Sequence, residues 1–286
     1  MIVYYNGAFM EQERVCISPD DRGFLFADGV YEVILAVQGR LFEADAHFAR
    51  LKRSLAALSI PAPDLTELRE KLKALLERNG LDQADARIYT QITRGVAPRG
   101  HAFPDGSVAP TIYASVETYT PPEEKWRDGV CAILVPDLRW ARCDIKSLAL
   151  LPNVLASQRA KEAGVYEAIF VREGVITEGS HTTVCAVFDG EVVTHPLTHH
   201  ILGGVTRQVV LGICDLLTIP YQEVPIDQDD LERADELMLL GTTSGVMPLV
   251  AVERRPVADG KPGPVTRKIQ TALRELIWPD GQDKDG

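Results

Sequence analysis

Strand and helix patterns follow one another in an irregular order along this chain, and that order limits the possible folds more than any other feature. Apolar runs rich in β-branched and aromatic residues predict strands, and apolar residues at helical spacing predict helices. The expected strands span residues 31–37, 86–93, 111–117, 129–136, 167–171, 182–187 and 236–240. The expected helices span residues 45–58, 64–78, 147–163, 205–217 and 265–277. Because strands and helices do not alternate regularly, an α+β architecture is favoured over a barrel or a doubly wound sheet.

A proline-rich stretch divides these elements into two groups. Thr118-Tyr-Thr-Pro-Pro-Glu-Glu-Lys125 has paired prolines, several charges and no apolar periodicity, which is typical of a linker. We therefore expect an N-terminal α/β domain over residues 1–118, a linker over 119–125 and a C-terminal α/β domain over 126–286. A chain of 286 residues is long enough to give each domain its own core.

The charge and cysteine content argue against several partners. A formal net charge of −11 disfavours nucleic acid and anionic membrane surfaces, which require a basic face. No stretch approaches the roughly 20 apolar residues of a membrane span, and the N-terminus lacks the pattern of a signal peptide. The five cysteines are widely spaced, so we expect neither a disulfide framework nor a metal site, and a cytoplasmic location.

Lys146 and Glu178 are the candidate residues with the most specific chemistry. A lysine amine forms a Schiff base with an aldehyde, and a carboxylate keeps a ring nitrogen protonated. Pyridoxal phosphate requires both groups, an amine and a carboxylate, from its protein. A lone lysine is more often a solvated surface cation, so the meaning of Lys146 depends on the residues that accompany it.

A phosphate group needs hydrogen-bond donors, and a helix that begins after glycines offers them. In Ile201-Leu-Gly-Gly-Val-Thr-Arg207, the amides of Val205 and Thr206 and the Thr206 hydroxyl can bind an anion. Thr242 lies in a second hydroxyl-rich turn, and either turn can equally be structural only. Arg50 lies beside apolar positions of its expected helix, where a solvated arginine is the alternative.

The irregular loop between the expected strands 86–93 and 111–117 contains a candidate carboxylate site. Arg99 can bind a carboxylate through two hydrogen bonds and a permanent charge, and His101 can add another donor. Such a pair in a loop often has no function. Tyr31 begins an expected strand and is either a core residue or a hydroxyl directed into a cleft.

Taken in order, these features resemble one family. Nearly the whole chain is similar to the branched-chain and D-amino-acid aminotransferases, the pyridoxal phosphate enzymes of fold type IV, and most of all to D-amino-acid transaminases. The shared motifs are Asp21-Arg22-Gly23-Phe24, Asp28-Gly29-Val30-Tyr31-Glu32, Thr93-Arg94-Gly95, Pro98-Arg99-x-His101, Arg142-Cys-Asp144-Ile-Lys146-Ser147-Leu148, Tyr166-Glu167-Ala168, Thr177-Glu178-Gly179-Ser180, Val205-Thr206-Arg207 and Thr242-Thr243-Ser244. Many spaced matches in one order are more specific than any single motif.

The resemblance implies a two-domain α+β fold of type IV and a role for each candidate residue. It implies that Lys146 is the catalytic residue and holds the cofactor covalently, while Glu178 pairs with the ring nitrogen. The residues implied for the cofactor phosphate are Arg50, Val205, Thr206 and Thr242. The residues implied for the substrate carboxylate are Tyr31, Arg99 and His101. Arg99 and His101 are implied to come from the partner subunit of a homodimer.

The implied activity is transfer of the amino group from D-alanine to 2-oxoglutarate, which gives pyruvate and D-glutamate, so the partners are small amino acids and 2-oxo acids. The alternatives are a branched-chain L-amino-acid aminotransferase, an (R)-selective amine transaminase, an aminodeoxychorismate lyase and a non-enzymatic protein that binds pyridoxal phosphate. Pro98-Arg99-x-His101 favours D-amino acids, because branched-chain enzymes lack this element and an amine without a carboxylate leaves the cation unpaired.

Three departures from the family concern details near the expected site. Ser180-His181-Thr182-Thr183 occupies a stretch where the family often has asparagine. Gly245 stands where a glutamate is common, and Gly203 where a lysine can occur. These departures put the hydrogen bonding near the ring and the side-chain preference in doubt, but not the reaction class.

Overall fold

The computed structural model describes residues 1–105 and 108–279, which form two compact units. The N-terminal unit contains Met1–Thr120 and Ile145–Leu150, and the C-terminal unit contains Pro121–Asp144 and the chain from Leu151 onward. These units differ from the expected domain boundaries in one important segment, because Ile145–Leu150, with Lys146, belongs to the N-terminal unit. Residues 280–286 of the expected C-terminal domain lie outside the described residues.

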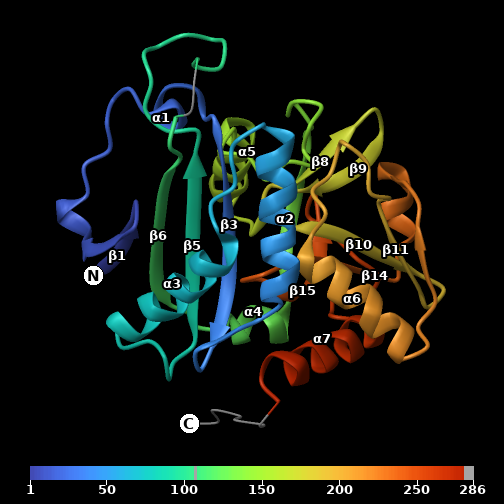
Figure 1. The fold of residues 1–286 in the computed structure, drawn as a ribbon. Coiled ribbons are helices and arrows are strands. Elements are labelled where there is room, and N and C mark those ends of the chain that lie inside the picture. Colours follow the sequence, from blue (N-terminus) through green and yellow to red (C-terminus); the bar gives the residue numbers. More distant parts are fainter. Residues whose placement is uncertain (106–107, 280–286) are drawn as a thin grey trace. The chain divides into compact units, whose positions relative to one another are not determined.

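An antiparallel sheet forms the centre of the N-terminal unit, with strand order β2-β1-β6-β5-β3-β4 (Figure 1). Its strands are β1 (Ile2–Tyr5), β2 (Ala8–Glu11), β3 (Gly29–Val37), β4 (Arg40–Leu41), β5 (Ala86–Thr93) and β6 (Thr111–Thr118). Its helices are the 3-10 turn η1 (Gln12–Arg14) and the α-helices α1 (Arg22–Phe26), α2 (Ala44–Ala57) and α3 (Leu65–Arg78). Leucines of α2 and α3, among them Leu51, Leu55 and Leu72, pack with Ile34 and Ile88 of the sheet into one core.

The C-terminal unit contains a larger, mixed sheet of order β12-β11-β10-β14-β15-β7-β8-β9-β13, with β16 paired to β15. Its strands are β7 (Val130–Pro136), β8 (Glu167–Arg172), β9 (Val175–Gly179), β10 (Thr183–Phe188), β11 (Glu191–Thr194), β12 (Tyr221–Glu223), β13 (Ile226–Asp227), β14 (Glu236–Gly241), β15 (Gly245–Val252) and β16 (Arg255–Pro256). Its helices are α4 (Glu123–Asp128), α5 (Leu151–Glu162), α6 (Val205–Leu216), the 3-10 segment η2 (Gln228–Arg233) and α7 (Pro264–Ile277). Helices α6 and α7 lie against each other and against β14 (Figure 1).

The expected start of one helix, at Ser147, was wrong. The helix expected over 147–163 begins only at Leu151, because the residues before it contact β3: Ser147 bridges Val30, and the Leu148 amide donates to the Gly29 carbonyl at 3.0 Å. Pro152 suits the first turn of α5, since that position needs no amide donor. The stretch expected to be a linker also contains the start of α4, which Trp126 anchors in the core.

Of the helices in the described part of the chain, none combines the length and the apolar character that crossing a bilayer requires.

Candidate active site

Lys146 is fixed by the first residues of β3. Its carbonyl accepts a hydrogen bond from the Tyr31 amide at 3.1 Å, and its own amide donates to the Ser54 hydroxyl of α2 at 3.2 Å. Its ammonium lies 4.3 Å from the centre of the Tyr31 ring. The structure therefore brings together two of the residues singled out from the sequence, the lysine and the tyrosine.

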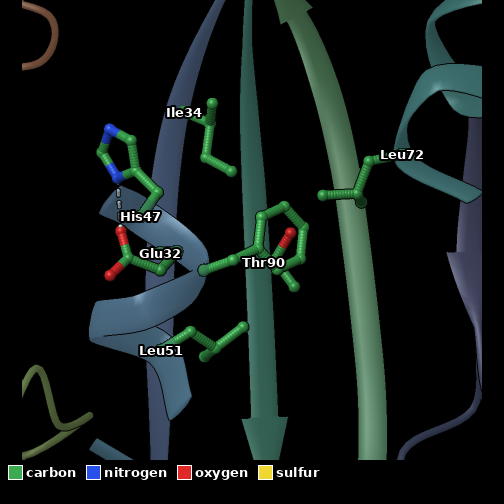
Figure 2. A pocket seen from close by; sticks show the side chains of 7 residues that line it. Glu32, Ile34, His47, Leu51, Leu72 and Thr90 are labelled. Carbon is green, nitrogen blue, oxygen red and sulfur yellow. Dashed lines mark hydrogen bonds and ion pairs between the residues drawn. The ribbon is translucent and has the colours of Figure 1, made fainter. Parts of the chain in front are cut away.

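Arg50 belongs to a buried cluster with Glu32 and His47. Its Nε and Nη2 atoms donate to the two oxygens of Glu32 at 2.7 and 2.8 Å, and His47 Nδ1 lies 2.8 Å from Glu32 Oε2. Figure 2 shows the Glu32–His47 contact beside Thr90, with Ile34, Leu51 and Leu72 around it. The guanidinium of Arg50 is thus buried and paired with a carboxylate, and it is not the solvated surface arginine that the sequence left as an alternative.

The charges of this cluster follow from burial and pairing. Burial alone would raise the pKa of Glu32, but Arg50, with smaller contributions from His47 and Lys146, lowers it to about 2. Burial, with smaller contributions from the charges of Arg50 and Lys146, lowers the pKa of His47 although Glu32 opposes this, so the histidine is neutral near pH 7. Sequence reasoning gave neither residue a role. The sequence feature that could have revealed Glu32 is a glutamate in the middle of an otherwise apolar strand.

Arg99 and His101 lie in the loop between β5 and β6, and both are exposed. The Arg99 guanidinium is 5.3 Å from the ring centre of Phe26, and the His101 ring is 5.7 Å from the same ring. The structure therefore brings these two residues together. Within the described part of the N-terminal unit, the Tyr31 ring lies against Lys146 and Tyr89, whereas Arg99 and His101 lie against Phe26.

Glu178, in β9, has two donors that fix its carboxylate. Arg139 Nη1 donates to one oxygen, and the Leu202 amide donates to the other at 3.0 Å. Arg139 is itself paired at 2.8 Å with Asp137, whose side chain is buried, and Asp137 also pairs with Arg172. Burial would raise the pKa of Asp137, but the two arginines lower it to about 2, while Asp137 and Glu178 raise the pKa of Arg139 against the effect of burial.

Val205 and Thr206 begin α6, as the glycines before them predicted. Gly204 is the N-cap residue and provides no side chain to cap the helix, and the first turn contains no acidic residue. A β-carbon at Gly204 would lie 2.9 Å from the Thr183 hydroxyl, so the backbone approaches closely there. The N-cap residue thus offers no side-chain acceptor to the first amides of α6, and a helix N-terminus of this kind attracts anions.

Thr242 lies at the tip of the hairpin that joins β14 to β15. Trp126 holds the base of this hairpin: its indole donates to the Ser244 carbonyl at 2.7 Å. Gly245 has φ +61°, and a β-carbon there would lie 3.0 Å from the Trp126 ring. The glycine at this position is therefore required by its left-handed backbone and by the tryptophan.

The departure at 180–183 concerns a buried carboxylate, Glu167. Ser180 Oγ donates to one of its oxygens at 2.6 Å and Thr182 Oγ1 to the other at 2.8 Å, while His181 Nδ1 lies 3.2 Å away. All three of these side chains therefore contact Glu167.

Comparisons with known proteins place this geometry in a family. A model of the family "Amino-transferase class IV" matches residues 29–252. The chain is 41% identical to a D-alanine aminotransferase of Bacillus licheniformis, over 97% of each chain. It is 40% identical to a D-alanine aminotransferase of Staphylococcus haemolyticus, over 96% of this chain and 97% of that one. The chain belongs to the class IV aminotransferases.

A solved structure confirms the expected fold. The branched-chain amino acid aminotransferase of Escherichia coli superimposes with a TM-score of 0.90 over 100% of this chain and 97% of its own, at 24% identity. The α+β fold of type IV, the aminotransferase reaction class and pyridoxal phosphate as the cofactor are thereby confirmed, and the substrates of this class IV aminotransferase are amino acids and 2-oxo acids.

The side chains of each unit fit that cofactor. In the C-terminal unit, the uncapped start of α6 suits a phosphate, and Glu178 offers a fixed carboxylate such as a pyridinium nitrogen requires. In the N-terminal unit, Lys146 supplies the amine, with the Tyr31 ring beside it. Among the described residues there is no group of three or more His, Cys, Asp or Glu side chains arranged to hold a metal ion.

Proposed function

We propose that this class IV aminotransferase transfers the amino group of D-alanine to 2-oxoglutarate, giving pyruvate and D-glutamate. The observation that carries the proposal is the identity of about 40% with D-alanine aminotransferases over nearly the whole of both chains. Similarity to the branched-chain enzyme, at 24% identity, is a similarity of fold and does not favour L-amino acids.

Lys146 is the acid–base residue of the proposed reaction. Bound pyridoxal phosphate supplies a sink for the electrons released when the Cα–H bond of the substrate breaks. Lys146 Nζ accepts the proton from the substrate Cα and then gives a proton back, so that one lysine both anchors the cofactor and moves the proton. Glu178 keeps the ring nitrogen protonated, and Arg139 and the Leu202 amide hold its carboxylate in place.

The remaining residues hold the two anionic groups. Arg50, the start of α6 at Val205 and Thr206, and Thr242 bind the cofactor phosphate in this proposal. Tyr31, Arg99 and His101 bind the substrate carboxylate. Because Lys146 acts from one face only, fixing the carboxylate end determines which enantiomer presents its Cα proton to the lysine. The relatives named D-alanine aminotransferase support the D enantiomer.

We further propose that two copies of the chain form a homodimer and that the protein is cytoplasmic. The exposure of Arg99 and His101 supports a role for both residues in the site of a partner subunit. The odd number and wide spacing of the cysteines support the location.

Substrate enantiomers provide the first test. Initial rates are measured with the D and L forms of alanine, glutamate and leucine as donors and 2-oxoglutarate as acceptor. D-alanine is expected to be transaminated faster than any L form. Faster turnover of L-leucine than of D-alanine would favour the branched-chain alternative.

Arg99→Ala provides the second test. Loss of the charged partner of a desolvated carboxylate should cost roughly 2–5 kcal/mol of substrate interaction. We expect kcat/KM for D-alanine to fall accordingly while pyridoxal phosphate stays bound. Arg87→Ala is the matched control, because Arg87 is an exposed arginine of the same unit that pairs with Glu117 on the neighbouring strand. Unchanged D-alanine kinetics in Arg99→Ala would refute the assignment of the carboxylate site.

A further inference from the structure

The motif Asp21-Arg22-Gly23-Phe24 begins helix α1, and the proposed reaction gives it no role. Asp21 is buried and caps α1, accepting from the Gly23 amide at 2.8 Å. Its other oxygen accepts from the hydroxyls of Thr93 at 3.0 Å and Thr111 at 2.6 Å. These threonines stand at the end of β5 and the start of β6, where the loop that carries Arg99 and His101 begins and ends. Asp21 thus attaches α1 to the base of this loop, whose described residues 94–105 we call the carboxylate loop.

Arg22 reaches from α1 to the middle of the carboxylate loop. Its buried guanidinium donates through Nη1 to the Gly100 carbonyl at 2.7 Å, and Nη2 lies 3.5 Å from the His101 carbonyl. Its Nε donates to Asp28 at 2.8 Å, which fixes the guanidinium plane. A buried arginine that satisfies loop carbonyls constrains the backbone between Arg99 and His101.

Phe26, at the end of α1, contacts the side chains of the same loop segment. Its ring centre lies 4.9 Å from the Arg22 guanidinium carbon, 5.3 Å from that of Arg99, and 5.7 Å from the His101 ring, which is tilted by 45°. A cation within about 6 Å of an aromatic ring is attracted to it. One ring therefore contacts both residues proposed to bind the substrate carboxylate.

The charges around α1 leave Arg99 as the cation available to a ligand. Asp28 is shared by Arg22 and by Arg94, which donates to it at 2.7 and 3.0 Å. These two arginines lower the pKa of Asp28 even though burial opposes them. Asp28 is therefore ionised and offsets positive charge of the arginines at the base of the loop. Within the described residues, no carboxylate forms an ion pair with Arg99. An arginine that has a fixed direction and no internal counterion is suited to an anionic group from outside.

We propose that Arg22 and Phe26 are positioning residues for the substrate carboxylate: Arg22 fixes the backbone of the carboxylate loop at Gly100 and His101, and Phe26 fixes the directions of the Arg99 and His101 side chains. This inference rests on the proposed function, because it concerns the residues proposed there to bind the carboxylate. It predicts that changes in α1 weaken carboxylate binding without changing cofactor binding or the proton-transfer step.

Phe26→Leu tests the aromatic contact. The variant keeps an apolar side chain but loses the ring, so KM for D-alanine should rise roughly three- to tenfold, the range expected for loss of cation–π contacts. The inhibition constant of propionate, a carboxylate without an amine, should rise by the same factor. The kcat at saturation, the melting temperature and the retention of pyridoxal phosphate should match the parent, and Phe26→Tyr should restore both constants.

Phe9→Leu is the matched control. Phe9 lies under Arg78 at 4.3 Å in the same unit, in the same kind of contact but on another part of the sheet. Phe9→Leu should leave KM and the propionate constant unchanged. Equal effects in Phe9→Leu and Phe26→Leu would overturn the positioning role, because they would show a general loss of stability.

Arg22→Lys tests the backbone contact separately. A lysine can still pair with Asp28, but it cannot reach Asp28 and the Gly100 carbonyl at once in the geometry of a guanidinium. KM and the propionate constant should again rise at unchanged cofactor retention. If Arg99→Ala raises both KM and the propionate constant while Phe26→Leu and Arg22→Lys match the parent, the positioning role is wrong and the proposed function stands. If Arg99→Ala itself changes neither constant, the proposed function fails.

Discussion

A buried cluster of arginine and carboxylate in each unit contains a candidate site residue, Arg50 in one and Glu178 in the other, and the two clusters offer opposite charges. In the N-terminal unit, Glu32 holds Arg50 by two hydrogen bonds, so the cluster presents a cation, near the amine of Lys146. In the C-terminal unit, Arg139 holds Glu178, and Asp137 in turn holds Arg139, so the cluster presents a carboxylate. In both clusters one carboxyl group has its pKa lowered to about 2 by the arginines beside it.

In the proposed function, this difference matches the two kinds of charge on the cofactor and substrate. A phosphate and an α-carboxylate need cations and amide donors, whereas a pyridinium nitrogen needs an anion. Each cluster balances its own formal charges, since His47 is neutral and Asp137 is offset by Arg172. The presented side chains are therefore held in place before any ligand binds, which is the condition for electrostatic preorganisation.

The largest expected effect belongs to the amine of the N-terminal unit. Lys146→Ala should lower transamination by about 10⁴-fold, the upper end of what a positioned acid–base group contributes. Borohydride reduction of the parent should attach the cofactor to the peptide that contains Lys146, as measured by mass spectrometry. Lys125→Ala is a suitable control, because Lys125 also lies against a tyrosine ring, 5.2 Å from that of Tyr166, but has no proposed role. Attachment of the cofactor to any other lysine would contradict the assignment.

The next effect belongs to the carboxylate of the C-terminal unit. Glu178→Gln removes the negative charge and places an amide where Arg139 and the Leu202 amide both donate, so one donor loses its acceptor. Turnover should fall by about 10²–10³-fold, as on removal of one preorganised electrostatic contact. The absorption spectrum of the bound cofactor should change while Lys146 remains attached to it.

Thr177→Val is the control for Glu178→Gln. Thr177 Oγ1 contacts the same arginine, at 3.3 Å from Arg139 Nη2, but carries no charge. It should retain most of the turnover. If Glu178→Gln keeps near-normal turnover, or if Thr177→Val is equally impaired, the role of the carboxylate at the ring nitrogen is refuted.

The two clusters also mark where sequence reasoning succeeded and where it failed. The order of Lys146 and Glu178 along the chain identified the family, and the glycines before Val205 placed the start of α6, because these signals are local. The partners Glu32 and Arg139 were missed, since their pairing joins residues 18 and 39 positions away in sequence and depends on how strands and helices pack.

Backbone context explains the other errors. The helical pattern after Lys146 was assigned from Ser147, but Ser147 and Leu148 contact β3, and the helix begins only at Leu151. Similarly, Asp45 begins the expected helix 45–58, whereas α2 starts at Ala44, and Glu43, with φ 51°, occupies the N-cap position. In each case a tertiary contact or a turn conformation overrides the local preference of the sequence.

The two clusters should lose their stabilising effect at different pH values in acid. Glu32 normally has a pKa of 4.5 and here has one of about 2, so its stabilising effect is complete above pH 4.5 and is lost as the pH falls toward 2. The free energy of unfolding should decrease by roughly 3 kcal/mol over this range, from a shift of about two and a half pKa units. The corresponding loss from Asp137 begins lower, near its ordinary pKa of 3.8.

Denaturant titrations between pH 2 and 7 measure this loss. Glu32→Gln should be less stable than the parent at pH 7, because it leaves Arg50 buried without its counterion, and it should show a flatter dependence between pH 4.5 and 3.8. Glu117→Gln, which removes the exposed partner of Arg87, should follow the parent curve. A Glu32→Gln curve parallel to that of the parent would show that Glu32 does not carry the acid dependence.

The smallest effect is expected at the start of α6, where the proposed phosphate donors belong to the backbone. Thr206→Ala removes one hydroxyl but leaves the helix amides, so the affinity for pyridoxal phosphate should fall by only about tenfold, equal to one hydrogen bond to a charged group. The apoenzyme should keep its melting temperature, and Thr206→Ser should retain the cofactor through dialysis as the parent does. Arg50→Ala, by contrast, should lower both cofactor affinity and the stability of the apoenzyme, because Glu32 and His47 then remain buried without their cation. Two results together would refute this assignment: Thr206→Ala retains the cofactor as the parent does, and Arg50→Ala is less stable but keeps its cofactor affinity. In that case the phosphate does not bind at these residues, and Arg50 has a structural role only.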